Sequence, residues 1–71
     1  MTQGERVKQA RKSLGLTLEQ FGEKVGVTKQ TVSRIENGIN NLTEQMIKSI
    51  CREFGVDYIW LTTGEGEMFV D

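Results

Sequence analysis

The spacing of apolar and small residues between positions 21 and 35 most constrains how this chain can fold. Apolar residues stand at positions 21, 25, 27, 32 and 35, and glycine stands at positions 22 and 26. Two stretches with helical apolar spacing are separated only by the short segment Val25-Gly26-Val27-Thr28. Such a short connection forces the two helices to cross steeply, as in a helix-turn-helix motif. The pattern predicts this motif over about residues 17–37, with an ordinary antiparallel helix pair as the alternative.

Gly22 is the strictest part of this pattern because it falls inside a predicted helix. Glycine in a helix interior is less favourable than alanine by about 1 kcal/mol. Its presence therefore indicates that the second helix touches its neighbour too closely for a side chain. Gly26 permits the positive φ that the turn requires.

Capping patterns and glycines predict five helices in one all-α domain that spans residues 1–71. A chain of 71 residues with 37% apolar residues can form one small core. Each helix is expected to begin at a residue whose side chain caps free backbone N–H groups, and to end at a glycine. Two of the starts, Thr2 with Glu5 and Thr17 with Gln20, have capping-box spacing. The expected starts are Thr2, Thr17, Thr28, Thr43 (or Asn41 with Glu44) and Asp57; the expected ends are Gly15, Gly26, Gly38, Gly55 and the segment 62–67.

Apolar residues at helical spacing predict the core. We expect Trp60 in the core and Tyr58 at least partly exposed, while the apolar tail 68–70 packs on its own domain or on a second subunit. The predicted buried stripes are Val7, Ala10 and Leu14; Leu18, Phe21 and Val25; Val32 and Ile35; and Ile47, Ile50, Cys51 and Phe54.

The third predicted helix carries a polar face opposite its buried edge. At 100° per residue, its Lys, Gln, Ser, Arg and Asn side chains fall within an arc of about 140°. Lys and Arg can donate to guanine O6 and N7, and Gln can pair with adenine. The face consists of Lys29, Gln30, Ser33, Arg34 and Asn37. It favours reading of base edges, and the alternative is an ordinary solvated helix face.

Charge is distributed unevenly along the chain, although the net charge is only −1. Residues 1–34 contain seven basic and three acidic residues, whereas residues 35–71 contain two basic and seven acidic residues. This asymmetry indicates that the first half meets a polyanion, with chance in a short chain as the alternative.

Composition argues against several other classes of protein. The chain has no histidine, the commonest metal ligand and general base, and its single Cys51 cannot form an internal disulfide. It has no apolar run of about 18 residues and no signal-peptide pattern. We therefore expect a cytoplasmic protein that is not an enzyme, with no metal, cofactor, membrane segment or small-molecule ligand.

Three stretches carry a resemblance to a known family: "RKSLGLT", "SRIENG" and "WLTTGEG". Over residues 5–69 the chain resembles the lambda-repressor-like family of helix-turn-helix regulators, also called the Cro or xenobiotic-response-element family. The resemblance implies a five-helix domain that binds double-stranded operator DNA as a transcriptional regulator, with its third helix in the major groove. Repression and a two-fold dimer are expected. The same fold can also serve as a protein-interaction module, such as an antitoxin or an adaptor, which is the alternative function.

The resemblance also implies a role for individual residues. Arg11 and Glu36 match a pair that joins the first helix to the third, and Glu36 lies near the buried edge, where an unpaired carboxylate would be costly. The base-contacting positions are Thr28, Lys29, Gln30, Ser33 and Arg34; the phosphate-contacting positions are Thr17, Asn37, Asn40 and Asn41, with Gln20 as a substitute.

Two departures from the family pattern reduce the expected number of charged phosphate contacts. Leu18 stands where many members have a phosphate-binding glutamine, and the loop "INNLT" lacks the usual basic residues. We therefore expect a shallow salt dependence of binding.

A dimer is expected because one recognition helix reads too few base pairs to find a site among ~10⁶ competing positions. The available apolar surface is the C-terminal helix and tail, about residues 57–71. A weak homodimer is therefore predicted through Tyr58, Ile59, Trp60, Met68, Phe69 and Val70.

Overall fold

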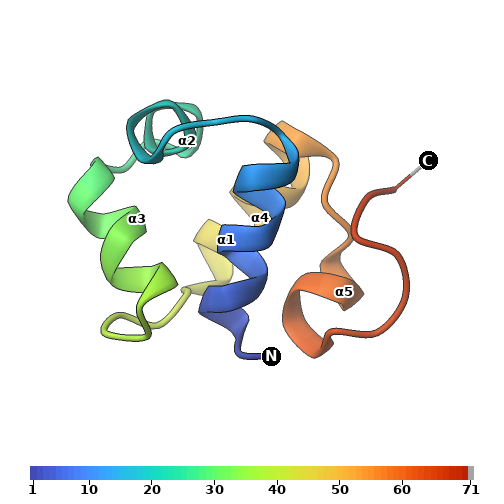
Figure 1. Cartoon of the computed structure of the whole chain (residues 1–71). Coiled ribbons are helices and arrows are strands. Elements are labelled where there is room, and N and C mark those ends of the chain that lie inside the picture. The colour runs from blue at the N-terminus through green and yellow to red at the C-terminus, as the bar shows by residue number, and fades with distance from the viewer. Residues whose placement is uncertain (71) are drawn as a thin grey trace.

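Five helices make up the part of the chain that the structure, a computed structural model, describes, which is residues 1–70. Asp71, the last residue of the predicted tail, lies outside the described residues. Figure 1 shows α3 and α5 on opposite sides of α1, and both contact it. The predicted all-α fold with five helices is confirmed. The helices are α1 (Gln3–Ser13), α2 (Leu18–Val25), α3 (Lys29–Glu36), α4 (Glu44–Phe54) and α5 (Tyr58–Thr63).

Side-chain caps fix where each helix begins, as the sequence predicted. The capping boxes of Thr2 with Glu5 and of Thr17 with Gln20 are both formed. Of the two possible starts of α4, Thr43 is the one used, because its hydroxyl accepts from the Met46 N–H.

The core is formed by residues from all five helices and from the segment before α5. Phe21 lies at its centre and stacks on Phe54, with 4.8 Å between the ring centroids. Trp60 is buried and Tyr58 is exposed, as predicted. The buried apolar residues are Val7, Ala10, Phe21, Val32, Ile35, Ile47, Ile50, Val56, Trp60 and Leu61.

Five predicted core residues are only half-buried, and all but Leu14 pack against the buried core: Leu14, Leu18, Val25, Cys51 and Phe54. Helix α1 ends at Ser13, one residue earlier than its apolar stripe suggests, so Leu14 is its C-cap and is only half-buried. Cys51 packs against the core but is also only half-buried. This burial, with the nearby Asp57 and Glu44 carboxylates, raises the pKa of the Cys51 thiol.

The C-terminal tail folds back on its own domain. The Asp57 N–H donates to the Met68 carbonyl (2.9 Å), and the Val70 N–H donates to the Gly55 carbonyl (2.8 Å). A β-bridge joins Val56 to Phe69. The side chains of Met68 and Phe69 therefore pack against the core of the same chain.

This arrangement reduces the apolar surface that is available for the predicted dimer. Trp60 is only 7% exposed, so it offers little surface to a second subunit. Phe69 and Met68 are already used by the monomer. The exposed apolar residues left in this region are Tyr58, Ile59 and Val70.

A buried arginine, which the sequence analysis missed, fastens α1 to α5. Arg6 is 7% exposed and donates to three backbone carbonyls. Its Nε donates to Leu61 (2.8 Å), its Nη1 to Met1 (2.9 Å) and its Nη2 to Thr62 (3.2 Å). Two of these acceptors belong to the last turn of α5, where a positive charge also interacts favourably with the helix dipole.

Candidate nucleic-acid interface

The turn between α2 and α3 fixes the position at which α3 begins. The Val27 N–H donates to the Gly22 carbonyl (2.8 Å), and Gly26 has a φ of 82°. A Cβ atom on residue 22 would lie 2.5 Å from the Val27 carbonyl oxygen. The predicted close contact at Gly22 is therefore confirmed, and it is with the backbone just before α3.

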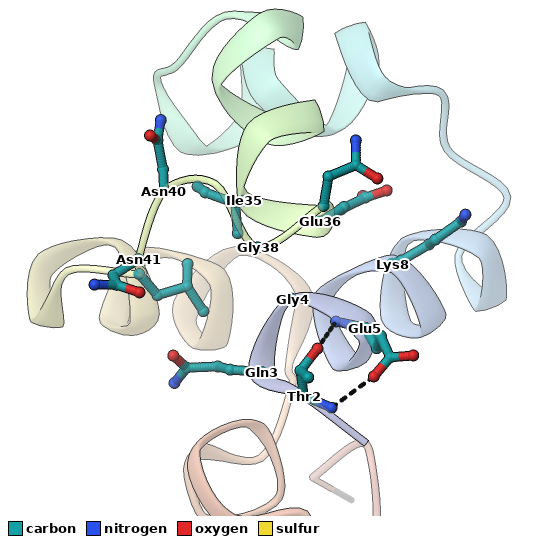
Figure 2. A pocket seen from close by; sticks show the side chains of 12 residues that line it. Thr2, Gln3, Gly4, Glu5, Lys8, Ile35, Glu36, Gly38, Asn40 and Asn41 are labelled. Atoms are coloured by element: carbon teal, nitrogen blue, oxygen red, sulfur yellow. Dashed lines mark hydrogen bonds between the residues drawn. The ribbon is translucent and has the colours of Figure 1, made fainter.

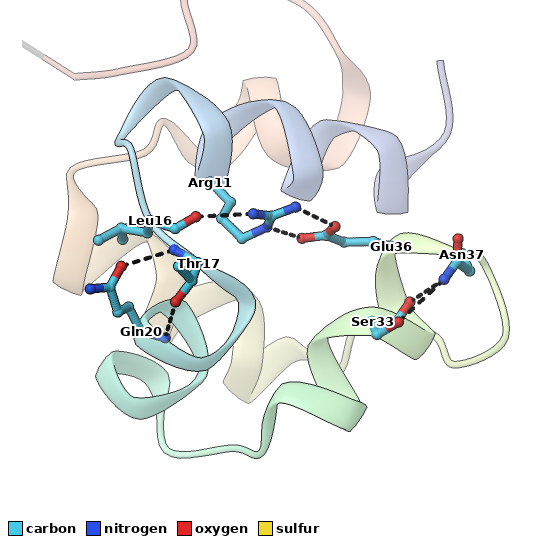
Figure 3. A network of polar contacts seen from close by, with 7 residues as sticks. All are labelled: Arg11, Leu16, Thr17, Gln20, Ser33, Glu36 and Asn37. Atoms are coloured by element: carbon cyan, nitrogen blue, oxygen red, sulfur yellow. Dashed lines mark hydrogen bonds and ion pairs between the residues drawn. The ribbon is translucent and has the colours of Figure 1, made fainter.

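The end of α3 is held by an ion pair with α1 (Figure 3). Arg11 Nε lies 2.7 Å from Glu36 Oε2, and Arg11 Nη2 lies 3.1 Å from Glu36 Oε1. Arg11 Nη1 also donates to the Leu16 carbonyl (2.9 Å), and the two side chains are only 12% and 5% exposed. Such a two-point pair fixes the relative geometry of the helices and neutralises the Glu36 carboxylate beside the polar face.

The polar face of α3 points away from the core. Lys29, Gln30 and Arg34 are exposed, and Ser33 is half-buried. Within residues 1–70, neither Lys29 nor Arg34 takes part in an ion pair. Thr28 caps the helix by accepting from the Thr31 N–H, and its hydroxyl lies 3.1 Å from that of Thr31.

The capping box at the start of α2 leaves hydrogen-bond donors available on the helix that precedes α3. Thr17 Oγ1 accepts from the Gln20 N–H (3.1 Å), and Gln20 Oε1 accepts from the Thr17 N–H (2.9 Å). Only acceptor atoms are used in these two bonds. The Thr17 hydroxyl proton and the Gln20 amide protons can still donate to a phosphate.

The three asparagines at the other end of α3 differ in their availability. Asn37 Nδ2 already donates to the Ser33 carbonyl (2.9 Å), so a phosphate contact from this amide requires exchange of that bond. Asn40 and Asn41 are exposed on the loop that follows α3. Their side chains are the free amide donors at this end.

A cleft of about 690 Å³ is lined by the first turns of α1 and by the end of α3 with the loop that follows it (Figure 2). Gln3 and Lys8 line it on the α1 side, and Asn40 and Asn41 line it on the loop side. Hydrogen bonds from the backbone and side chain of Thr2 lower the pKa of Glu5 at its edge.

Residues 1–70 contain no group of three or more His, Cys, Asp and Glu side chains placed to hold a metal ion. No helix formed by these residues has both the length and the apolar character of a membrane span.

Comparison with known proteins identifies the family. A family model described as helix-turn-helix matches residues 7–61. The chain belongs to the helix-turn-helix family of DNA-binding transcriptional regulators. The predicted family is thus confirmed, and the matched region contains the α2–α3 turn and the polar face of α3.

Individual members of the helix-turn-helix family resemble the chain over most of its length. The HTH-type transcriptional regulator YgzD of Bacillus subtilis is 39% identical over 59 residues, which cover 79% of this chain and 89% of YgzD. Antitoxin PezA of Streptococcus pneumoniae is 35% identical over 65 residues, which are 92% of this chain but only 40% of PezA.

A solved structure of SinR, a master regulator for biofilm formation, shows the same fold in complex with DNA. It superposes with a TM-score of 0.77 at 33% sequence identity, covering 84% of this chain and 97% of the SinR chain.

Proposed function

We propose that this chain represses transcription by placing α3 in the major groove of double-stranded operator DNA. The observation that supports this proposal most is the exposed face of Lys29, Gln30 and Arg34, whose cations have no ion-pair partner within residues 1–70. Base edges in the major groove offer acceptors that fit these donors. Thr28 and Ser33 complete the base-contacting set at the edges of this face. The similarity to SinR, whose structure was solved in complex with DNA, also supports the proposal that this chain binds DNA.

Phosphate contacts are assigned to polar groups that flank α3 at both ends. We assign Thr17 and Gln20 to the phosphates of one DNA strand, and Asn40 and Asn41 to those of the other. Asn37 can also contact a phosphate once its amide gives up the hydrogen bond to the Ser33 carbonyl. Arg11 and Glu36 keep α3 in place between them. Because the flanking donors are uncharged, binding should depend less steeply on salt than in a protein with basic flanks.

Repression requires only that the protein occupy a promoter, because bound protein excludes the polymerase. No surface other than the DNA-binding face is needed for this. The family consists of DNA-binding regulators, so we assign no enzymatic activity and no cofactor. Because the proposed partner is DNA, we propose a cytoplasmic location.

A weak homodimer through α5 fits the geometry of two adjacent major grooves. Two recognition helices on one face of DNA lie about 34 Å apart, so each α3 lies about 17 Å from the two-fold axis. The domain measures 28 × 21 × 21 Å, and α5 lies across α1 from α3 (Figure 1). The axis can therefore pass near α5, where Ile59 is 54% exposed.

Selection of binding sites from random duplex DNA tests the function directly. The chain should enrich a two-fold symmetric site whose half-sites are about one helical turn apart. Enrichment of no sequence would remove the proposed function.

Arg34→Ala is expected to weaken binding to the selected site by roughly 1–3 kcal/mol, the usual size of a lost base contact. Its exposed position means that the thermal melt should not change. Arg52→Ala is the matched control, because it removes the same charge from an exposed position on α4. A binding titration and a circular-dichroism melt of each variant decide the matter. Equal affinity losses for the two would mean that Arg34 contributes only general charge.

Ile59→Ser is expected to weaken binding to the full site about tenfold while leaving binding to a half-site unchanged, because removing an apolar side chain from the interface weakens the dimer. Gln45→Ser is the control, since it introduces the same serine at an exposed position of α4 without a change of charge. Sedimentation with and without a full-site duplex gives the stoichiometry. A dimer that survives Ile59→Ser must use another surface.

A second function, a protein-binding module such as an antitoxin, is favoured by one observation, the 35% identity to PezA. Retention on immobilised random duplex DNA separates the two functions. A DNA-binding regulator should be retained at low salt and released as salt rises. A module that binds only protein should not be retained at any salt concentration.

A further inference from the structure

Helix α3 is contacted at both ends by the backbone of a glycine from another helix. Gly22 of α2 meets the Val27 carbonyl just before α3 begins. Gly4 of α1 meets the other end: a Cβ atom on residue 4 would overlap the Ile35 carbonyl oxygen and would lie 3.2 Å from the Glu36 carbonyl oxygen. Figure 2 shows Gly4 directly beside the end of α3.

The contact at Gly4 leaves no room for a small local adjustment. The atoms that a Cβ would meet are backbone atoms of α3, which cannot rotate aside as the end of a flexible side chain can. Gly4 is itself buried within a helix. Any other residue at position 4 must therefore move the end of α3 away from α1.

Such a movement would be transmitted to DNA-facing groups. Arg34 directly precedes Ile35, and its carbonyl accepts from the N–H groups of Ile39 (2.8 Å) and Asn40 (3.2 Å). The end of α3 and the loop that follows it are thus joined by hydrogen bonds. A binding site requires its side chains to be held within about 0.5 Å of the productive geometry.

We infer that Gly4 is a positioning residue of the DNA-reading surface: its missing side chain sets where Arg34 and the Asn40 loop stand relative to the start of α3. This inference rests on the proposed function for its effect on DNA. Gly22 then sets the position of the start of α3, and Gly4 sets the position of its end. A side chain at position 4 should therefore displace only the end of the helix.

The test is Gly4→Ala in the full chain, with Gln9→Ala, at an exposed position of α1, as the control. Residual dipolar couplings of the DNA-free protein should show a changed orientation of α3 relative to α1. Affinity for the duplex that the wild-type chain selects should fall about tenfold, which corresponds to one lost base contact. The loss of base discrimination should fall at the positions that Arg34→Ala also affects, and not at those that Lys29→Ala affects.

Two results would overturn the inference. One is an unchanged α3 orientation in Gly4→Ala together with wild-type discrimination at every base pair. The other is a variant that remains unfolded even in trimethylamine N-oxide, which favours folded states, because Gly4 would then serve the fold rather than the position of α3. If the wild-type chain selects no DNA site, the proposed function fails, while the couplings still decide whether Gly4 positions α3.

Discussion

Replacing Gly22 with leucine is expected to lower the free energy of unfolding by roughly 3 kcal/mol, the upper part of the usual range for overpacking a tight contact. A Cβ at position 22 would lie 2.5 Å from the Val27 carbonyl oxygen and 3.3 Å from the carbonyl group of Thr28. Those atoms form the turn before α3, so the clash cannot be relieved without opening the α2–α3 crossing. A domain of this size has a total stability of only about 4–10 kcal/mol, so the loss is large.

Glu23→Leu is the matched control, because it introduces the same side chain one residue along α2 at an exposed position. Surface substitutions usually change stability by less than about 0.5 kcal/mol. Urea unfolding of both variants, followed by circular dichroism, gives the comparison. If Gly22→Leu is as stable as Glu23→Leu, the crossing is looser than the geometry indicates.

The helices and their boundaries could be predicted because their signals are local. A capping threonine, a glutamate or glutamine at the third position and a glycine at the end all belong to one short segment of the chain, as at Thr17, Gln20 and Gly26. The close contact at Gly22 was predictable for a similar reason, since glycine is disfavoured in the helix interior unless the space is occupied.

Contacts between distant parts of the chain were harder to predict. Arg6 reaches carbonyls of Leu61 and Thr62, more than fifty residues away, and arginine is mostly found exposed in proteins. Its only signal is its place four residues before Ala10, on the buried side of α1. The return of Phe69 to pair with Val56 depends in the same way on a turn whose direction the sequence does not specify.

In the candidate interface, too, local features could be predicted and contacts between distant residues could not. The face of Lys29, Gln30 and Arg34 follows from helical periodicity once Val32 and Ile35 are assigned to the core. The bond from Asn37 to the Ser33 carbonyl depends on a side-chain rotamer, which periodicity does not specify. The contact of Gly4 with α3 depends on how α1 packs, so it became visible only in three dimensions.

Arg6→Met is expected to lower the free energy of unfolding by about 2–4 kcal/mol, because each hydrogen bond from a charged donor typically contributes about 1.5–3 kcal/mol and the freed carbonyls are partly rehydrated. Methionine fills most of the volume of the arginine stem but cannot donate. The carbonyls of Leu61 and Thr62 then lose their partner at the end of α5, and Met1 loses its link to α1. At about 4–8 °C per kcal/mol for a domain of this size, the melting temperature should fall by roughly 10–25 °C.

Lys8→Met is the matched control, since it removes a positive charge from an exposed position on the same helix and inserts the same side chain. Hydrogen exchange of the α5 amides adds a local measurement to the thermal melts. Arg6→Met should accelerate exchange in α5 more than in α2 and α3, because the carbonyls that Arg6 binds belong to α5 and to Met1. Equal melting temperatures for the two variants would show that the carbonyls at the end of α5 are satisfied as well by water as by Arg6, and that the packing of Trp60 and Leu61 is enough to hold the C-terminal helix.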